Sequence, residues 1–241
     1  LLVLPVLAGY IAFLALRARR WRTLLRGLEA LVLGLGLSAF FWLPALLERQ
    51  WVKVSNLLGG YLNYQNHFVY LHQLVYSPWG YGLSLPGTPD KMSFGLGLAQ
   101  LLLLVAGIVV ARVLRAQLRE KGEGWAHFWF FVWILVLSLV LATDNSIALW
   151  AALPLLQYLE FPWRALVLAA FATAFIAGLP ILAIPEVRWH WVLWAVLGLI
   201  LVTGMPRAYP ERYYEIRDAD YAPEVIAAQG IEVTTTGEYE P

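Results

Sequence analysis

Glu160 and Arg164 carry opposite charges at the start of a long apolar run, within the segment LEFPWRALVL at residues 159–168. A planar guanidinium grips a phosphate through two parallel N–H groups, so Arg164 is a candidate for binding the phosphate or pyrophosphate of a lipid-linked substrate. The alternative is that Arg164 extends to membrane lipid phosphates or pairs with Glu160. Pro162 fits the first turn of a helix and Glu160 suits the positive end of its dipole, whereas the cation of Arg164 opposes that dipole and needs a partner.

Segments 48–92 and 144–162 combine polar and aromatic side chains. The further candidates for binding a substrate or a lipid phosphate in these segments are Tyr64, His67, Trp79 and Asp144. Aromatic rings with polar tips suit a membrane interface, and they also suit stacking against the C–H faces of a sugar, so both interpretations stay open. Asp144 or Ser146 could instead cap a short helix by accepting hydrogen bonds from its free N–H groups.

Metal binding has weak support in the sequence. His67 and His72 would point roughly 140° apart on a helix, unlike the i, i+4 pair of zinc-binding helices, so hydrogen-bonded histidines are favoured and no metal site is expected. Asp218 and Asp220 form a D-x-D pattern, which in sugar-nucleotide enzymes can hold a divalent cation, but helix capping is the favoured interpretation. No other cofactor is evident, and the chain's 0 cysteines exclude disulfides and thiolate ligands.

The composition indicates that these residues are positioned by membrane-spanning helices. The chain has 241 residues, of which 61% are hydrophobic and 14% charged, whereas soluble domains contain about 25% charged residues. Its first residues already have the character of a span, so we expect that Leu1 is not the native start.

An apolar helix needs about 20 residues to cross the hydrocarbon layer. Six stretches predict an all-α polytopic protein with a transmembrane domain over 1–205, and they are 1–16, 28–47, 93–111, 125–143, 163–184 and 189–205. The connections after the first and third stretches contain the arginine clusters of 17–26 and 112–119, which the positive-inside rule places in the cytoplasm. Segments 48–92, 144–162 and 206–241 are then extracytoplasmic, and the protein belongs to the inner or plasma membrane.

The outer segments predict additional short elements. Residues 63–76 read as one short helix at the membrane interface, and 144–162 as two interfacial half-helices broken at Pro154. The polar tail 206–241 contains a short helix over 222–230 and a strand over 231–239, which we expect to be the incomplete start of a small α+β extracytoplasmic domain.

Four quoted stretches carry a resemblance that covers most of the chain: LNYQNHFVYLHQLVYSPWGYG, PDKMSFGLG, LPLLQYLEFPWR and TTTGEYEP. Together they resemble the bacterial and archaeal integral membrane proteins labelled 6-pyruvoyl-tetrahydropterin synthase-related, which are akin to GT-C-type membrane glycosyltransferases. The resemblance implies a many-span protein whose outer loops form one working face. GT-C enzymes transfer a sugar from a polyprenyl-phosphate donor and carry an acidic base in their first outer loop, which we expect upstream of Leu1. No position in this chain matches that residue, so the catalytic residue is unknown.

Two functions follow from these observations. The first is a GT-C-type glycosyltransferase-like protein that binds or acts on a polyprenyl-phosphate-linked sugar at the outer leaflet, with membrane lipid, the donor and a glycan acceptor as partners and no nucleic acid. The second is a non-catalytic envelope protein that binds or positions lipid or polysaccharide. A transporter is less favoured, because the central parts of the six stretches contain no Asp, Glu, Lys or Arg, and ion-coupled transport uses such groups at mid-membrane.

Overall fold

The computed structural model describes residues 2–51, 59–87, 90, 92–120, 124–183, 185–210, 213, 215 and 217–228. These residues form helices and irregular segments, and no strand: their only β-type pairing is two isolated bridges, Val69 with Thr143 and Tyr81 with Met92. The all-α prediction is confirmed for this part of the chain. The predicted strand over 231–239 lies outside the described residues.

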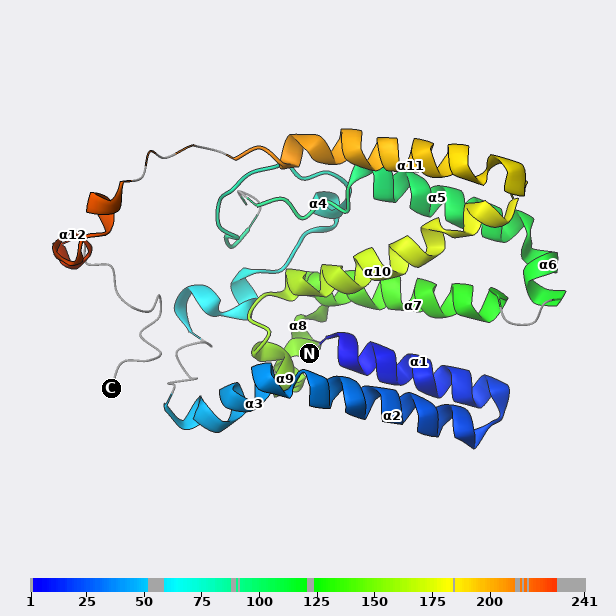
Figure 1. Ribbon diagram of the computed structural model, residues 1–241, viewed down its shortest axis with the longest axis horizontal. Helices are drawn as coiled ribbons and strands as arrows, with labels where there is room; N and C mark the ends of the chain where they lie inside the picture. Colours follow the sequence, from blue (N-terminus) through cyan, green and yellow to red (C-terminus); the bar gives the residue numbers. More distant parts are fainter. Residues whose placement is uncertain are drawn as a thin grey trace.

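The longer helices lie side by side in one layer (Figure 1), in the order α11, α5, α10, α7, α1, α2. Their bounds are α1 Val3–Ala18, α2 Trp21–Leu37, α5 Leu98–Val113, α7 Gly124–Ala142, α10 Leu166–Ala177 and α11 Trp189–Gly204. The shorter α-helices are α3 Ala39–Glu48, α4 Leu71–Val75, α6 Arg115–Glu120, α8 Ile147–Ala152, α9 Pro154–Gln157 and α12 Pro223–Ala228. The 3₁₀ helices are η1 Arg49–Trp51, η3 Gly60–Leu62, η4 Tyr64–Asn66, η5 Asp144–Ser146, η6 Pro162–Ala165, η7 Leu179–Ala183, η8 Glu186–Arg188, η9 Met205–Arg207 and η10 Asp218–Tyr221.

Three of the described helical stretches are long and apolar enough to cross a membrane: Gly124–Ala142, Pro162–Leu182 and Glu186–Arg207. A fourth is obtained if α2 and α3 count as one bent span. The prediction of six full spans was therefore too high. The stretches 1–16 and 93–111 do contain helices, but α1 and α5 have 16 residues each, below the length of about 20 that a straight span needs. Residues 92–97 are not helical, and Gly97 among them has a φ of 92°, a conformation suited to glycine.

The predicted span 28–47 is broken at Ser38, where the chain bends by 67°. In an unbroken helix the Leu35 carbonyl would accept from the N–H group of residue 39. Here it accepts hydrogen bonds from the Ser38 hydroxyl at 3.1 Å and from the Trp42 indole N–H at 2.9 Å. Side-chain donors that compete with the backbone ladder are a known cause of sharp kinks.

The core lies where α10 packs between α7 and α5. Its largest side chains come from α7 and α10, with Phe131 of α7 stacked on Phe175 of α10 at a ring separation of 3.8 Å. Gly107 of α5 allows that helix to approach α10, because a Cβ at this position would overlap the Ile176 carbonyl oxygen. By contrast, α2, α3 and α11 bury no residue although they are apolar. Lipid is the environment that such helices suit.

Figure 1 places the connecting segments at two opposite ends of the helix layer. One end holds the α1–α2 turn, α6 and the α10–α11 connection, and it therefore contains both arginine-rich segments, 17–26 and 112–119. The other end, called the loop end below, holds α3, α4, α8, α9 and the start of the tail. The predicted half-helices of 144–162 are confirmed as α8 and α9, separated at Leu153.

The prediction of one helix over 63–76 was wrong. The segment forms the single turn η4, an extended stretch, and the five-residue α4. Val69 in the extended stretch donates its N–H to the Ala142 carbonyl at 2.8 Å, and a residue engaged in this way cannot also continue a helix. The predicted helix of 222–230 is confirmed in the described range as α12.

The close approach of α5 and α10 yields a first prediction. Gly107→Ala should lower the free energy of unfolding by about 1–3 kcal/mol, because the added methyl group forces backbone to move in a packed core. The matched control is Gly198→Ala in α11, where a Cβ would meet no atom within 4 Å. Thermal unfolding in detergent measures both, and an equal loss of stability in the two variants would contradict the packing described.

Candidate functional site

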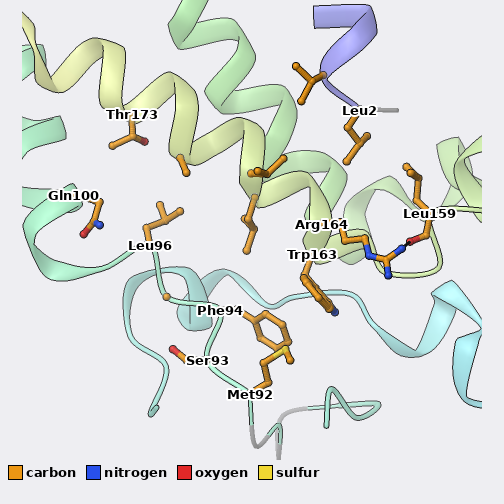
Figure 2. A pocket seen from close by; sticks show the side chains of 15 residues that line it. Leu2, Met92, Ser93, Phe94, Leu96, Gln100, Leu159, Trp163, Arg164 and Thr173 are labelled. Atoms are coloured by element: carbon orange, nitrogen blue, oxygen red, sulfur yellow. Dashed lines mark hydrogen bonds between the residues drawn. The ribbon is translucent and has the colours of Figure 1, made fainter. Parts of the chain in front are cut away.

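A cavity of about 660 Å³ opens beside the first turns of α10, at the loop end of the molecule (Figure 2). Its wall comes from three separate parts of the chain: residues 2–3 before and within α1, residues 92–96 with Gln100, and residues 159–173 around η6 and α10. Most of the lining is aliphatic or aromatic, including Leu96, Leu159, Leu166 and Val167. Arg164 is the one charged residue among the described residues that line it.

Arg164 is held by three contacts, all made within its own turn. Its Nη1 lies 3.2 Å from a carboxylate oxygen of Glu160 and donates a hydrogen bond of 2.8 Å to the Leu159 carbonyl. The guanidinium carbon also lies 4.7 Å from the centre of the Phe161 ring, which is a cation–π distance. The Arg164 side chain is 44% exposed and that of Glu160 is 18% exposed, so solvent or headgroups still reach the guanidinium.

These contacts leave one edge of the guanidinium available. The ion pair and the hydrogen bond both use Nη1, whereas Nε and Nη2 make no polar contact with the described residues. Nε–H and Nη2–H are parallel donors, and such a pair matches two oxygens of a phosphate or carboxylate. Glu160 therefore fixes the orientation of Arg164 without occupying the edge that binds an anion.

The turn that carries Glu160 is sharply folded. Glu160 has a φ of 61°, a left-handed conformation that is uncommon for a residue with a Cβ. The Phe161 N–H donates to the Leu159 carbonyl at 2.6 Å, and Pro162 is buried at the first position of η6. Pro162 thus stands where the sequence predicts it. Glu160, the strained residue, is paired with the guanidinium of Arg164. Residues with strained backbone often lie at ligand-binding sites.

Two buried polar atoms on the cavity wall lack hydrogen-bond partners within the described structure, the Trp163 indole nitrogen and the Thr173 hydroxyl. Figure 2 shows Trp163 and Arg164 at one edge of the cavity and Thr173 and Gln100 toward the opposite edge. The indole N–H is a donor only. The Trp163 indole nitrogen is buried, so Arg164 is the residue whose N–H donors at this edge complement an anion.

His67 and Tyr64 are packed inside the loop end and do not line the cavity. His67 is 1% exposed, and its ring nitrogens contact the Ser84 hydroxyl at 3.0 Å and the Tyr61 carbonyl. A carbonyl only accepts, so Nε2 donates to Tyr61. Tyr64 is 8% exposed and stacks on Trp150, with ring centres 5.5 Å apart. Both side chains hold segments of the loop end together.

Trp79 and Asp144 are exposed, and they also lie outside the cavity lining. Trp79 packs edge-to-face against Tyr81, and Arg207 lies over its ring at 5.9 Å. The Ser146 hydroxyl donates to the carbonyls of Leu141 and Thr143. Neither Asp144 nor Ser146 makes a side-chain capping bond, so the capping alternative for these residues was wrong.

No group of three or more metal-ligating side chains occurs among the described residues. Asp218 is exposed in η10, and the side chain of Asp220 lies outside what the structure describes. His67, which the sequence singled out, uses both ring nitrogens in hydrogen bonds, and this leaves none for a metal ion.

Sequence reasoning missed several residues that shape the site. Trp163, Thr173 and Gln100 line the cavity, and Asp90 ties together the segments of Gln73 and Leu85 at the loop end. Asp90 accepts from the Leu85 N–H at 2.7 Å and from the Gln73 amide at 2.9 Å. The available signal was the single uncharged polar side chain in each of two apolar helices, Gln100 in the first turn of α5 and Thr173 in α10.

The packed state of His67 gives a second prediction. His67→Ala should lower the free energy of unfolding by about 1–3 kcal/mol, because it leaves buried polar partners without hydrogen bonds. Cleavage of segment 59–87 by an added protease should rise in parallel. The matched control is His72→Ala, since His72 is exposed in α4. Equal effects of the two variants would show that His67 does not hold the segments of the loop end together.

Comparison with known proteins does not assign a function to this site. No family model, no curated protein and no solved structure matches the chain. The cavity beside Arg164 is therefore the feature of the chain that points most directly to a function.

Proposed function

We propose that this chain binds a polyprenyl-phosphate-linked sugar at the outer leaflet of the cell membrane, as part of a GT-C-type glycosyltransferase-like protein. The observation that carries the proposal is the Nε–Nη2 edge of Arg164, held in place beside an apolar cavity. An amphipathic ligand needs two features together, hydrogen-bond donors for its phosphate and an apolar wall for its hydrocarbon chain.

The phosphate binds at the edge of the cavity formed by Arg164. Arg164 contributes two parallel N–H groups, and Glu160 keeps the guanidinium from turning away. The negative charge of Glu160 is already balanced by Nη1, so the phosphate meets a fixed bidentate donor. Charge-assisted bidentate bonds are among the strongest that side chains make.

The hydrocarbon chain runs along α10. The lining there is formed by Leu166, Val167 and Ala170 and ends at Thr173, which follows Arg164 by about 14 Å along the helix axis. That depth is close to half of the roughly 30 Å hydrocarbon layer. A volume of about 660 Å³ lies within the range of about 300–1,000 Å³ that ligand pockets have.

The membrane arrangement follows from the charges at the two ends. The arginine-rich end lies in the cytoplasm and the loop end faces outward, because basic connections stay on the cytoplasmic side. In this arrangement Gly124–Ala142, Pro162–Leu182 and Glu186–Arg207 cross the bilayer between the two ends.

Catalysis is the less supported part of the proposal. In a glycosyltransferase an acidic base deprotonates the acceptor while Arg164 stabilises the charge that grows on the phosphate leaving group. Among the described cavity-lining residues there is no carboxylate, and Glu160 is engaged by Arg164. This observation favours the second candidate, a non-catalytic envelope protein that binds or positions the same lipid.

Arg164→Lys tests the phosphate grip. The substitution keeps the positive charge and the pair with Glu160 but removes the two parallel donors, so affinity for a polyprenyl phosphate should fall about tenfold, or about 1.4 kcal/mol. Binding of the uncharged polyprenol, which has the same chain, should not change. Titration of the purified protein in detergent, followed by native mass spectrometry, measures both ligands.

The control is Arg49→Lys, because Arg49 lies at the same end of the molecule and borders a neighbouring cavity. It should leave the affinity for polyprenyl phosphate unchanged. Unchanged affinity in Arg164→Lys would discard the two-pronged grip and leave Arg164 as a residue that pairs with Glu160 and faces lipid.

Single introduced cysteines test the sidedness, since the natural chain has 0 cysteines. Tyr76→Cys and Tyr213→Cys lie at exposed positions of the loop end and the tail, and Arg188→Cys lies at the opposite end. A membrane-impermeant maleimide should label the first two in intact cells and the third only after permeabilisation. Labelling of all three from one side would contradict the proposed arrangement.

A further inference from the structure

The turn between α1 and α2 concentrates positive charge at the end of the molecule away from the cavity of Arg164. Its arginines are Arg17, Arg19, Arg20, Arg22 and Arg26. Arg20, Arg22 and Arg26 are exposed, and within the described structure their guanidinium groups contact no carboxylate and no aromatic ring. Such a concentration is unusual in a chain whose formal net charge is +1.

These three arginines border one cavity. It has a volume of about 480 Å³ and is lined by Arg20, Trp21, Arg22, Thr23 and Arg26. Arg22 and Arg26 lie one turn apart on α2, so their side chains share a face. Arg20 is brought to the same place by the tight turn, in which Arg19 has a φ of 49°.

The two helices of the hairpin that carries this cavity are closely packed. Gly27 of α2 lies so close to α1 that a Cβ there would overlap the Ile11 side chain. The N–H groups of Arg19 and Arg20 close the end of α1 by donating to the carbonyls of Leu16 and Ala15, both at 3.3 Å. The arginines are therefore presented from the end of a closely packed hairpin.

The charge and the surroundings indicate the ligand. Three guanidinium groups around one cavity, with no carboxylate among its described lining residues, complement an anion with more than one negative charge, and guanidinium geometry favours phosphate. The hairpin buries no residue of α1 or α2, and Trp21 is 68% exposed. Apolar exposed helices ending in arginine and tryptophan place this turn at the level of lipid headgroups.

We propose that the α1–α2 turn is a binding site for an anionic membrane lipid whose headgroup carries two phosphates. Two phosphates supply two negative charges and enough oxygens for Arg20, Arg22 and Arg26 together. A lipid with one phosphate leaves most of the positive charge unbalanced. The site lies at the opposite end from Arg164 and does not depend on the proposed function.

The test compares two double variants of the full chain. Arg22→Gln with Arg26→Gln removes two of the three lining guanidiniums, and Arg112→Gln with Arg188→Gln removes two exposed arginines from the same end of the molecule. Native mass spectrometry counts bound diphosphatidylglycerol, which has two phosphates, and phosphatidylglycerol, which has one. Diphosphatidylglycerol binding should fall about tenfold or more in the first variant and less than about twofold in the second, because only the first loses charge-assisted bonds to phosphate.

Three results would overturn the proposal. The first is an equal loss in the two double variants, which would show that only the general charge of this end matters. The second is equal binding of diphosphatidylglycerol and phosphatidylglycerol when the two lipids are supplied at the same total number of phosphates. The third is full displacement of the lipid by soluble pyrophosphate, which would assign the site to a water-soluble diphosphate. Both variants keep Arg164 and Glu160, so failure here leaves the binding of polyprenyl phosphate untouched.

Discussion

The close packing of α10 against α5 and α7 sets the position of the helix that forms one wall of the cavity beside Arg164. Gly107 lets the α5 backbone reach α10, and the Phe131–Phe175 stack joins α10 to α7. The Ser138 hydroxyl of α7 donates to the Ala165 carbonyl, at the junction of η6 and α10. The first two contacts hold the last turn of α10 and the third holds its start, while another side of the helix forms the cavity wall. A well-placed guanidinium depends on this support, because a binding group is only as ordered as the backbone beneath it.

The cavity combines an apolar wall with a polar edge. Its wall along α10 is apolar, while its edge at Arg164 presents N–H donors. The ion pair with Glu160 is short-range and partly exposed, so it adds little to the stability of the fold. Its effect is on geometry, since it holds one nitrogen of the guanidinium and leaves the opposite edge for a ligand.

The apolar runs predicted the helices well, because a long uninterrupted run at 124–142 or 162–182 has few other ways to satisfy its backbone. The break at Ser38 was not predictable, since its causes are hydrogen bonds from Ser38 and Trp42 to one carbonyl. The proximity of Glu160 and Arg164 was visible in the spacing. The partners of His67 were not, because Ser84 is brought to it by the folding of a long loop. The lining of the cavity was equally hidden, as it comes from three distant parts of the chain.

The bend at Ser38 has an effect on the surrounding bilayer. If α2 runs across the membrane, α3 turns away from it by 67° and lies closer to the membrane plane than to its normal. Phe40, Phe41 and Leu47 are exposed along α3, so in that arrangement the helix presents an apolar surface to the acyl chains of one leaflet. The protein then occupies more area in that monolayer than in the other. Such an asymmetric footprint couples its insertion to the lateral pressure and curvature of the membrane around it.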